Sequence, residues 1–353
     1  MVGIALLGAG IFARTEHLPA VETASSLFEL KAVYSRSQSS ATELATASKN
    51  PSAVAIYFDS PSVPGQGLAD LLARDDISAV IVALPILTQP AIIRQAIEAG
   101  KHVLSEKPVA GDLGAAIRLI GWYDSRSAPG KPIWAVAENF RFIDNLDFAA
   151  EKLREIGGNV VTFSLKCNNF VQPDNKYFNT AWRKVPEYQG GFLLDGGVHF
   201  VAALRLLLGA GGQQIRQLVG FSGLLEEHLL PVDTIQAVAR TQDGKIGSIS
   251  LSFGTEFKSG LEVEIVTTKG AVTWTPTKVS TFTKKDGKEA KEEKEFTYNS
   301  GVKNEVVAFG EAIAAGKADE RQTPKEALKD LEILEKLLKS GDQGAAVKEV
   351  QDY

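Results

Sequence analysis

The chain has 353 residues, which at about 100 to 200 residues per domain predicts two domains, each with its own core. Hydrophobic residues make up 44% and charged residues 23% of the sequence, so wholly disordered and collagen-like chains are excluded. The net charge of −5 gives no overall attraction to the phosphates of nucleic acids or to anionic lipids, and we expect neither as a partner.

Cysteine and histidine usage argues against disulfides and metal centres. Cys167 is the only cysteine, so neither an internal disulfide nor a CxxC pair can form. The histidines are far apart and lack zinc-site spacing; they are His17, His102, His199 and His228. We interpret His17 and His102 as structural. No apolar run approaches the roughly 20 residues needed to span a bilayer, and we expect a cytoplasmic protein.

The first third of the chain alternates strand-like and helix-like stretches. The strand-like stretches include 2–7, 29–34, 79–84, 102–104 and 134–137, and the helical ones include 41–47 and 92–99. Six strands separated by helices are typical of an α/β fold with a doubly wound parallel sheet. We place this domain at residues 1–138.

After about Phe140, polar and apolar residues alternate with period two, which indicates strands with two unlike faces. The clearest examples are 161–167, 248–253 and 262–265. This pattern predicts an α+β domain over residues 139–322 with a large, mainly antiparallel open sheet. The sheet's serine-rich face is either solvated or pairs with a second copy of the chain, and we expect a homodimer.

Two local signals mark the last part of the chain. Asp286-Gly287 lies inside a locally neutral, lysine- and glutamate-rich stretch and predicts a hairpin turn. Thr323, Pro324 and Glu326 form a capping box that predicts a helix start, followed by leucines on one helix face. We expect residues 323–353 to form a helix and tail that pack back on the first domain.

A dinucleotide-binding sequence follows the first strand and opens a helix. It reads Gly8-Ala9-Gly10-Ile11-Phe12-Ala13, which matches GxGxxG/A with alanine in the third small position. Gly8 allows a tight turn, Gly10 leaves room for a pyrophosphate, and Ala13 lets helix and strand approach. The helix start supplies N–H donors for the phosphates. The alternative is a strand-to-helix turn that merely requires small residues.

The end of the second strand predicts the choice of cofactor. An acidic residue there would bind the ribose 2′-hydroxyl of NAD, but this sequence has Ser35, Arg36 and Ser37. The Arg36 guanidinium suits a 2′-phosphate, which favours NADP(H). The alternative is a surface arginine without a ligand.

Ligands bind beyond the carboxyl ends of strands in open α/β sheets, which draws attention to Glu106-Lys107-Pro108. Pro108 disfavours helical geometry at Lys107, so the amine can point into a cleft. A solvated loop lysine is the alternative.

Asp195 and His199 form a second candidate pair. If a helix starts near Asp195, their i,i+4 spacing places both side chains on one face. Histidine titrates near neutrality and can exchange a proton with an alcohol or carbonyl oxygen. Alternatively, Asp195 is a helix cap and His199 a buried core histidine.

Four motifs occur in a characteristic order: GAGIFAR, EKP, AENFRF and GGFLLDGGVHF. Together they resemble the glucose-fructose oxidoreductase/inositol dehydrogenase (Gfo/Idh/MocA) family over nearly the whole chain, and the stretch from Lys176 to His199 is similar to fungal NADPH-dependent members. The resemblance implies a Rossmann domain, a substrate domain, and hydride transfer between nicotinamide and a carbonyl or hydroxyl carbon of a sugar, polyol, aldehyde or ketone.

The resemblance also implies residue roles. Lys107 would hydrogen-bond the reacting oxygen, His199 would be the general acid/base, and Asp195 would orient substrate or histidine, although Lys107 and His199 could exchange roles. Trp182 and Arg183 would reach the nicotinamide end of the cofactor. Further cofactor or pocket contacts would come from Leu84, Pro85, Glu106, Asn139 and Arg141.

One motif departs from the family pattern. Many relatives carry TPNxxH after the fourth strand, whereas this chain has Leu84-Pro85 followed by Gln89 at the histidine position.

An NADP(H)-dependent oxidoreductase is the main interpretation. A non-catalytic NADP(H)-binding sensor or transcriptional regulator of the same fold is the alternative, and a dihydrodiol- or biliverdin-type reductase is a third possibility among enzymes. The joint presence of Lys107, Asp195 and His199 favours catalysis.

Overall fold

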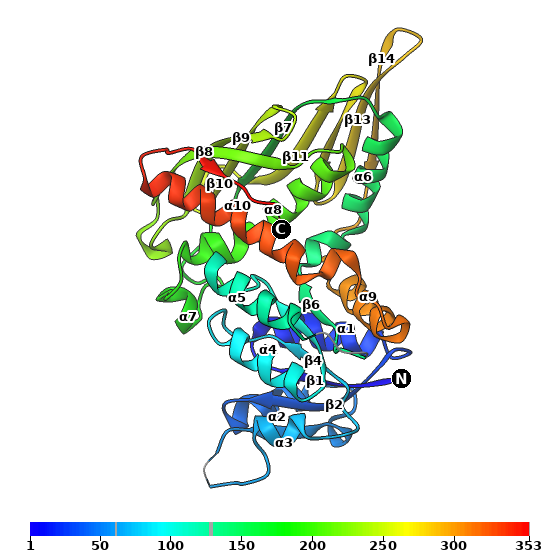
Figure 1. Ribbon diagram of the computed structural model, residues 1–353, viewed down its shortest axis with the longest axis vertical. Helices are drawn as coiled ribbons and strands as arrows, with labels where there is room; N and C mark the ends of the chain where they lie inside the picture. Colours follow the sequence, from blue (N-terminus) through cyan, green and yellow to red (C-terminus); the bar gives the residue numbers. More distant parts are fainter. Residues whose placement is uncertain (61, 127–129, 353) are drawn as a thin grey trace. The chain divides into compact units, whose positions relative to one another are not determined.

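The computed structural model describes residues 1–60, 62–126 and 130–352. It divides into two compact units (Figure 1). Unit 1 comprises Met1–Asn139 and Val302–Leu328, and unit 2 comprises Phe140–Gly301 and the residues from Lys329 onward. Each unit contains one sheet, as the sequence predicts.

Unit 1 contains a parallel six-stranded sheet in the order β3-β2-β1-β4-β5-β6. The strands are β1 (Val2–Leu7), β2 (Phe28–Ser35), β3 (Ala55–Phe58), β4 (Ala79–Val82), β5 (His102–Glu106) and β6 (Trp134–Ala137). The doubly wound sheet is confirmed; the sequence pattern had given no range for β3. The strand order reverses at β1, which pairs with both β2 and β4, and such a reversal marks the usual ligand-binding position.

Helices cover this sheet. They are the π-helical turn η1 (Ala13–His17), α1 (Leu18–Thr23), α2 (Gln38–Thr46), α3 (Leu68–Leu72), α4 (Gln89–Glu98), α5 (Leu113–Asp124) and α9 (Val302–Ala315), with 3-10 turns η2 (Pro51–Ala53) and η5 (Glu320–Gln322). Helix α9 comes from the distant C-terminal segment. It buries Val306 and Phe309 in the same core as Ile4, Val33 and Leu104.

Unit 2 contains a nine-stranded sheet in the order β14-β13-β12-β11-β7-β10-β9-β8-β15. The strands are β7 (Val160–Asn168), β8 (Ile215–Gly223), β9 (Thr234–Thr241), β10 (Ile246–Ser252), β11 (Gly260–Thr267), β12 (Gly270–Thr275), β13 (Lys278–Lys285), β14 (Lys288–Glu295) and β15 (Lys348–Glu349). All neighbours pair antiparallel except β7 and β10, which are parallel. The large, mainly antiparallel sheet is therefore confirmed.

The helical segments of unit 2 include α6 (Asp144–Ile156), α7 (Ala181–Lys184) and α8 (Gly191–Ala210), with the 3-10 turn η4 (Glu227–Leu229). The 3-10 turn η3 (Asn139–Phe142) begins at the last residue of the first segment of unit 1 and continues into unit 2. Helix α8 packs against α6, β7 and β11. By length and composition alone it is apolar enough to span a membrane, which corrects the expectation that no such run exists. Because 67% of its apolar stretch is buried within the fold, α8 has the properties of a core helix.

The two C-terminal signals have different outcomes. Asp286 and Gly287 have φ values of 53° and 77° and connect β13 to β14, which confirms the hairpin. The Glu326 N–H binds Thr323 Oγ1 (3.3 Å) at the start of α10 (Pro324–Asp342), as predicted.

The placement expected for residues 323–353 is corrected. Residues from Lys329 onward belong to unit 2, where β15 extends the sheet by pairing with β8. The segment that returns to unit 1 is Val302–Leu328. A capping box fixes where a helix begins. Which core the helix joins depends on how its apolar face packs, and that packing involves residues far apart in the sequence.

Candidate active site

The dinucleotide loop lies at the carboxyl end of β1. Gly8 has a φ of 115°, and a Cβ built there would lie 2.1 Å from the carbonyl oxygen of Ala83. Gly8 is therefore required by the protein itself. At Gly10, in contrast, a Cβ would meet no protein atom within 4 Å, so the protein leaves open space beside this residue.

The first helical turn follows this loop directly. The Arg14 N–H donates to the Gly10 carbonyl at 3.1 Å, so a helical turn begins directly after Gly10. The N–H groups of a first helical turn point away from the helix and suit an anion. Together with the space beside Gly10, this geometry fits a cofactor pyrophosphate.

Arg36 is exposed immediately beyond β2, after the half-buried Ser35. Ser37 caps α2 by accepting a hydrogen bond from the Ser40 N–H (3.3 Å). The hydroxyl of Tyr34 donates to Asp59 Oδ2 (2.7 Å), and burial together with Asp59 raises the pKa of Tyr34. An arginine thus stands where NAD-dependent proteins commonly place an acid, while Asp59 is engaged by Tyr34.

Glu106 is the last residue of β5 and Lys107 is the first residue beyond it. Both are half-buried, and Lys107 lies in a bend, as its position before Pro108 predicts. The Nε2 atom of the fully buried His17 lies 2.6 Å from Glu106 Oε1. The residue taken as merely structural from the sequence therefore fixes the neighbour of Lys107. Its spacing from the glycine loop gave no indication of this contact.

Beyond β4, Leu84 and Pro85 are half-buried and precede α4. Gln89 begins that helix and is 1% exposed, and neither amide atom of its side chain has a hydrogen-bond partner among the described residues. This is the position where many relatives carry histidine. A buried amide without protein partners has hydrogen-bonding capacity available for a ligand or water.

Sequence reasoning missed Glu305 on α9 in unit 1. Its side chain is fully buried, and the carboxyl groups of Glu106 and Glu138 and the amine of Lys107 act on it electrostatically. Glu138 and Asn139 are themselves buried just beyond β6. The only sequence signal for Glu305 is its place on the same helix face as the apolar residues Val302, Val306 and Phe309.

In unit 2, Asp195 lies within α8, which begins at Gly191. We expected a helix to start near Asp195, but α8 starts four residues earlier. It follows Gly190, whose left-handed backbone (φ 71°) ends the preceding segment. Asp195 is 4% exposed, and its Oδ2 accepts a hydrogen bond from Arg183 Nε at 2.7 Å. Arg183 also donates to the carbonyl of Tyr177 (3.1 Å).

Aromatic rings surround this ion pair. The Arg183 guanidinium carbon lies 4.1 Å from the centre of the Trp182 ring, which lies 6.0 Å from the Tyr188 ring. The buried Tyr188 hydroxyl has no hydrogen-bond partner among the described residues. Burial, with the nearby Asp195 carboxylate as a second cause, raises the pKa of Tyr188. Sequence reasoning missed Tyr188.

His199 lies one helical turn after Asp195 on α8, as the i,i+4 spacing requires. Its half-buried ring stacks on Phe140, with centroids 4.9 Å apart and planes inclined by 21°. Phe140 is held in turn by Phe200 and Trp274. The imidazole orientation is thus fixed by packing.

Arg141 does not fit the pocket-lining role expected for it. It is buried in an ion pair with Asp330, which also pairs with Arg205. Two arginines sharing one buried carboxylate form a structural network between η3, α8 and α10. The sequence showed Arg141 beside a site motif but not its partner, which is far along the chain.

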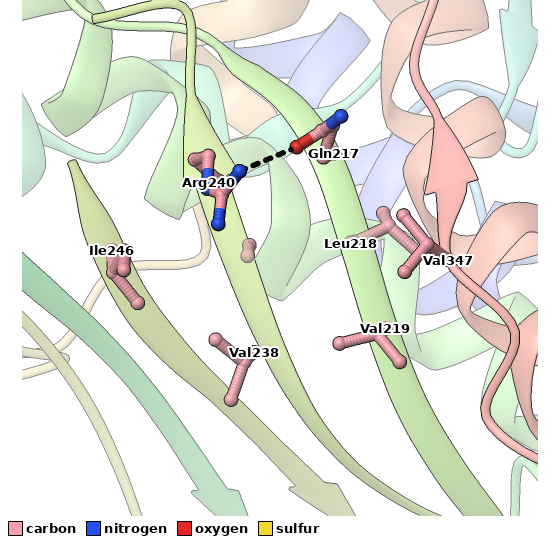
Figure 2. Close-up of a pocket in the computed structure, with 8 residues that line it drawn as sticks. Gln217, Leu218, Val219, Val238, Arg240, Ile246 and Val347 are labelled. Atoms are coloured by element: carbon pink, nitrogen blue, oxygen red, sulfur yellow. Dashed lines mark hydrogen bonds between the residues drawn. The ribbon is translucent and has the colours of Figure 1, made fainter. Parts of the chain in front are cut away.

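Among the described residues, no group of three or more histidine, cysteine, aspartate or glutamate side chains is arranged to hold a metal ion. A hollow is present on the open face of the unit 2 sheet (Figure 2). Its lining includes Val219, Val238 and Ile246, and Arg240 there donates to Gln217 Oε1 (3.1 Å). Its apolar lining has no catalytic group.

The structure therefore brings the predicted residues together in two sets. The loop 8–13 and residues 35–36, 84–85, 106–107 and 139 lie at or just after the carboxyl ends of strands of the unit 1 sheet. Trp182, Arg183, Asp195 and His199 gather around the first half of α8 in unit 2.

Comparisons with known proteins identify the family of both domains. Residues 2–128 match a family model described as an oxidoreductase family with an NAD-binding Rossmann fold, and residues 153–348 match that family's C-terminal alpha/beta domain. The chain belongs to the Gfo/Idh/MocA oxidoreductase family. The family resemblance seen in the four motifs is confirmed, including its fungal affinity, since the chain is 53% identical to dehydrogenase FPY6 of Fusarium mangiferae over 99% of both chains.

Solved structures of Gfo/Idh/MocA-like proteins extend the comparison. An oxidoreductase from Thermotoga maritima is 31% identical, with a TM-score of 0.84, and the match covers 99% of this chain and 98% of that one. GenD2 from gentamicin A biosynthesis, solved in complex with NAD, is 26% identical, with a TM-score of 0.78 and coverage of 99% and 97%. A nicotinamide cofactor is therefore supported for this Gfo/Idh/MocA member.

Proposed function

We propose that this protein is an NADP(H)-dependent oxidoreductase that transfers hydride between nicotinamide and a carbonyl or hydroxyl carbon of a small sugar, polyol, aldehyde or ketone. The observation that carries the proposal is the placement of Lys107. The residue follows β5 at the same sheet edge as the dinucleotide loop, and its neighbour Glu106 contacts His17 at 2.6 Å. A protein that only bound the cofactor would have no use for such an amine.

The choice of NADP(H) rests on Arg36. Gly10 and the first turn of the helix fit the pyrophosphate that NAD and NADP share, so they do not discriminate. An exposed guanidinium beyond β2 can bind a 2′-phosphate through charge-assisted hydrogen bonds, which contribute about 1.5 to 3 kcal/mol each. The bound cofactor supplies or accepts the hydride.

The residues of the chain manage the proton that accompanies the hydride. When a carbonyl is reduced, its carbon gains a hydride and its oxygen gains a proton, and the reverse holds for alcohol oxidation. We assign the hydrogen bond to the reacting oxygen to Lys107 and proton exchange to His199. The stacked Phe140 holds the His199 ring in one orientation, and Asp195, held by Arg183, orients substrate or histidine.

We also propose that the protein forms a homodimer through the open face of the unit 2 sheet. Val238 and Ile246 are 48% and 51% exposed on this face, and Phe221 is 67% exposed. Apolar side chains gathered on one exposed face are typical of interfaces. Light scattering at micromolar concentration tests this, with Val238→Glu expected to shift the mass from two chains to one.

A cytoplasmic location is proposed because Cys167 is buried and without a disulfide partner.

The function is tested by following NADPH oxidation with the purified protein against a panel of aldehydes, ketones, sugars and dicarbonyls, and NADP⁺ reduction with the matching alcohols and polyols. Turnover by at least one class, lost in Lys107→Met and His199→Ala, is expected. Tight NADPH binding without turnover across the whole panel would instead favour the sensor or regulator. Equal use of NADH would contradict the cofactor assignment.

A further inference from the structure

His17 is the last residue of η1, the turn that follows the dinucleotide loop. This turn is π-helical, because the Leu18 N–H donates to the carbonyl of Ala13, five residues earlier. Turns of this kind are rare and frequently occur at functional sites. Arg14 of the same turn is exposed, whereas His17 is 0% exposed. The side chain of His17 therefore lies inside unit 1.

The His17 ring is held by a hydrogen bond and an aromatic contact. Its Nε2 atom lies 2.6 Å from Oε1 of Glu106, whose side chain is only 12% exposed. An ionised carboxylate can only accept a hydrogen bond, so we assign the proton of this contact to Nε2. The Nδ1 atom is buried and has no partner within the described part of the chain. Phe12 of the dinucleotide loop packs edge-on against the ring, with centroids 5.2 Å apart and planes at 78°.

Glu106 connects this contact to the loop that carries Lys107. It is the last residue of β5, where it is paired with Ala137 of β6, and Lys107 is bonded to it directly. The sheet holds the backbone of Glu106, and His17 holds its side chain. The residue from which Lys107 leaves the strand is therefore fixed at two points, one of which belongs to η1.

We propose that His17 is a positioning residue, which acts through Glu106 to set the place of Lys107 relative to the dinucleotide loop. This inference rests on the catalytic role proposed for Lys107. His17 itself exchanges no proton with substrate, because it is fully buried. Misplacing a catalytic group by about 1 Å can cost roughly a hundredfold in rate, so a single buried hydrogen bond can have a large effect on turnover.

Two substitutions separate this hydrogen bond from the packing of the ring. His17→Gln keeps an N–H donor near the place of Nε2, whereas His17→Leu fills the space without a donor. With NADPH and the best substrate of the panel, His17→Leu should lower kcat roughly ten- to a hundredfold, and His17→Gln should retain most of it. The Kd for NADPH should stay near the wild-type value in both. Equal kcat in the two variants, or an equally large loss of NADPH binding in His17→Leu, would overturn the proposal.

His102→Leu is the matched control for damage to β5. His102 begins this strand, at the end opposite Glu106, and its Nδ1 accepts a hydrogen bond from the Ile133 N–H (3.0 Å). The variant loses an imidazole hydrogen bond in the same sheet, so its Tm should fall while kcat below the unfolding transition stays near the wild-type value. A kcat loss as large as that of His17→Leu would indicate general loosening of β5, and the proposal would be wrong.

Glu106→Met tests whether His17 acts through Glu106. The double variant with His17→Leu should be no slower than Glu106→Met alone, because the hydrogen bond is already absent. If the two losses in kcat multiply, His17 acts by another route and the proposal fails.

Nitrogen-15 NMR of histidine-labelled protein tests the hydrogen bond without turnover. The His17 signals are those that are absent from His17→Gln. Nε2 of His17 should carry a proton in the wild-type protein, and its chemical shift should change in Glu106→Met. A proton on Nδ1 beside a bare Nε2 would mean that His17 donates nothing to Glu106, which would contradict the proposal.

Competitive labelling of lysines with acetic anhydride tests the positioning of Lys107 independently of activity. The rate at Lys107, relative to the exposed Lys258, should change in His17→Leu and stay near the wild-type value in His17→Gln. An unchanged rate in His17→Leu would remove the link to Lys107. If the wild-type protein turned over no substrate, the proposed function would fail, yet the NMR signals and the labelling rates would still decide whether His17 positions Lys107.

Discussion

Arg183 Nε donates a hydrogen bond to Asp195 Oδ2 at 2.7 Å, which joins the four-residue helix α7 to the interior of α8. Asp195 is therefore a buried carboxylate whose charge is balanced by a side chain twelve positions earlier. This pair ties the segment carrying Trp182 to the helix carrying His199. Its strength can be measured directly.

A double-mutant cycle with Arg183→Met and Asp195→Asn should show strong coupling. Arg183→Met leaves the buried Asp195 without its guanidinium, so the free energy of unfolding should fall by about 2 kcal/mol or more. The double variant should be less destabilised than the sum of the single ones, with a coupling energy of roughly 0.5 to 3 kcal/mol. Urea unfolding measures all four proteins, and additive effects would mean that the pair contributes nothing.

Gly8 and Gly10 should differ when each is replaced by alanine. Gly8→Ala forces a side chain into a left-handed conformation and against the Ala83 carbonyl, at a cost of about 1 to 3 kcal/mol from the backbone alone. Gly10→Ala meets no protein atom, so its Tm should stay close to that of the wild type. Its methyl group would instead obstruct the pyrophosphate and weaken NADPH binding. Calorimetry and fluorescence titration separate the two effects, and undisturbed binding by Gly10→Ala would count against this site.

Arg36→Ala should raise the KM for NADPH roughly ten- to a hundredfold and leave the KM for NADH nearly unchanged, because only NADPH carries the 2′-phosphate. Arg74→Ala is the control. This variant also removes one positive charge from unit 1, but Arg74 is partly exposed before β4 and is paired with Asp76 (2.7 Å). The KM values for NADPH and NADH should therefore both stay near those of the wild type. Parallel losses for the two cofactors in Arg36→Ala would refute the assignment.

His199→Ala should lower kcat by roughly 10²- to 10⁴-fold, as expected for the loss of a general acid, while the Kd for NADPH stays nearly the same. His228→Ala is a useful comparison, because that histidine contacts the Val171 carbonyl (2.7 Å) in unit 2 and has no proposed role in catalysis. Stopped-flow measurement of NADPH oxidation gives the rates. A near-normal kcat in His199→Ala would make Lys107 the proton donor.

The stability of the protein should depend on pH through Glu305. Because its folded-state pKa is raised above 4.5, the folded protein binds this proton more tightly than the unfolded chain. The stabilisation is thus fully present below pH 4.5 and is lost as pH rises from 4.5 towards the folded-state pKa. The Tm difference between Glu305→Gln and wild type should accordingly shift in favour of the variant over that range. A pH-independent difference would contradict a raised pKa.

Local sequence signals determined several features correctly. The glycine loop after β1, the alternation in β7 and β10, the Asp286-Gly287 turn and the Thr323 cap each depend on residues within a few positions of one another. Backbone conformation and side-chain periodicity are fixed at that range, so the doubly wound sheet and the mainly antiparallel sheet could be predicted. The order of the four motifs likewise indicated the family before any contact was known.

Tertiary structure alone decided which distant groups meet. The sequence contains no sign that His17 contacts Glu106, that Arg141 is held by Asp330, or that the charges of Glu106 and Lys107 act on the buried Glu305. The expectation drawn from the sequence for the C-terminal tail was also wrong, because β15 of that tail joins the unit 2 sheet. The physical reason is that buried polar groups are satisfied, and their pKa values set, by whatever side chains packing brings near them, and packing joins residues without regard to their separation along the chain.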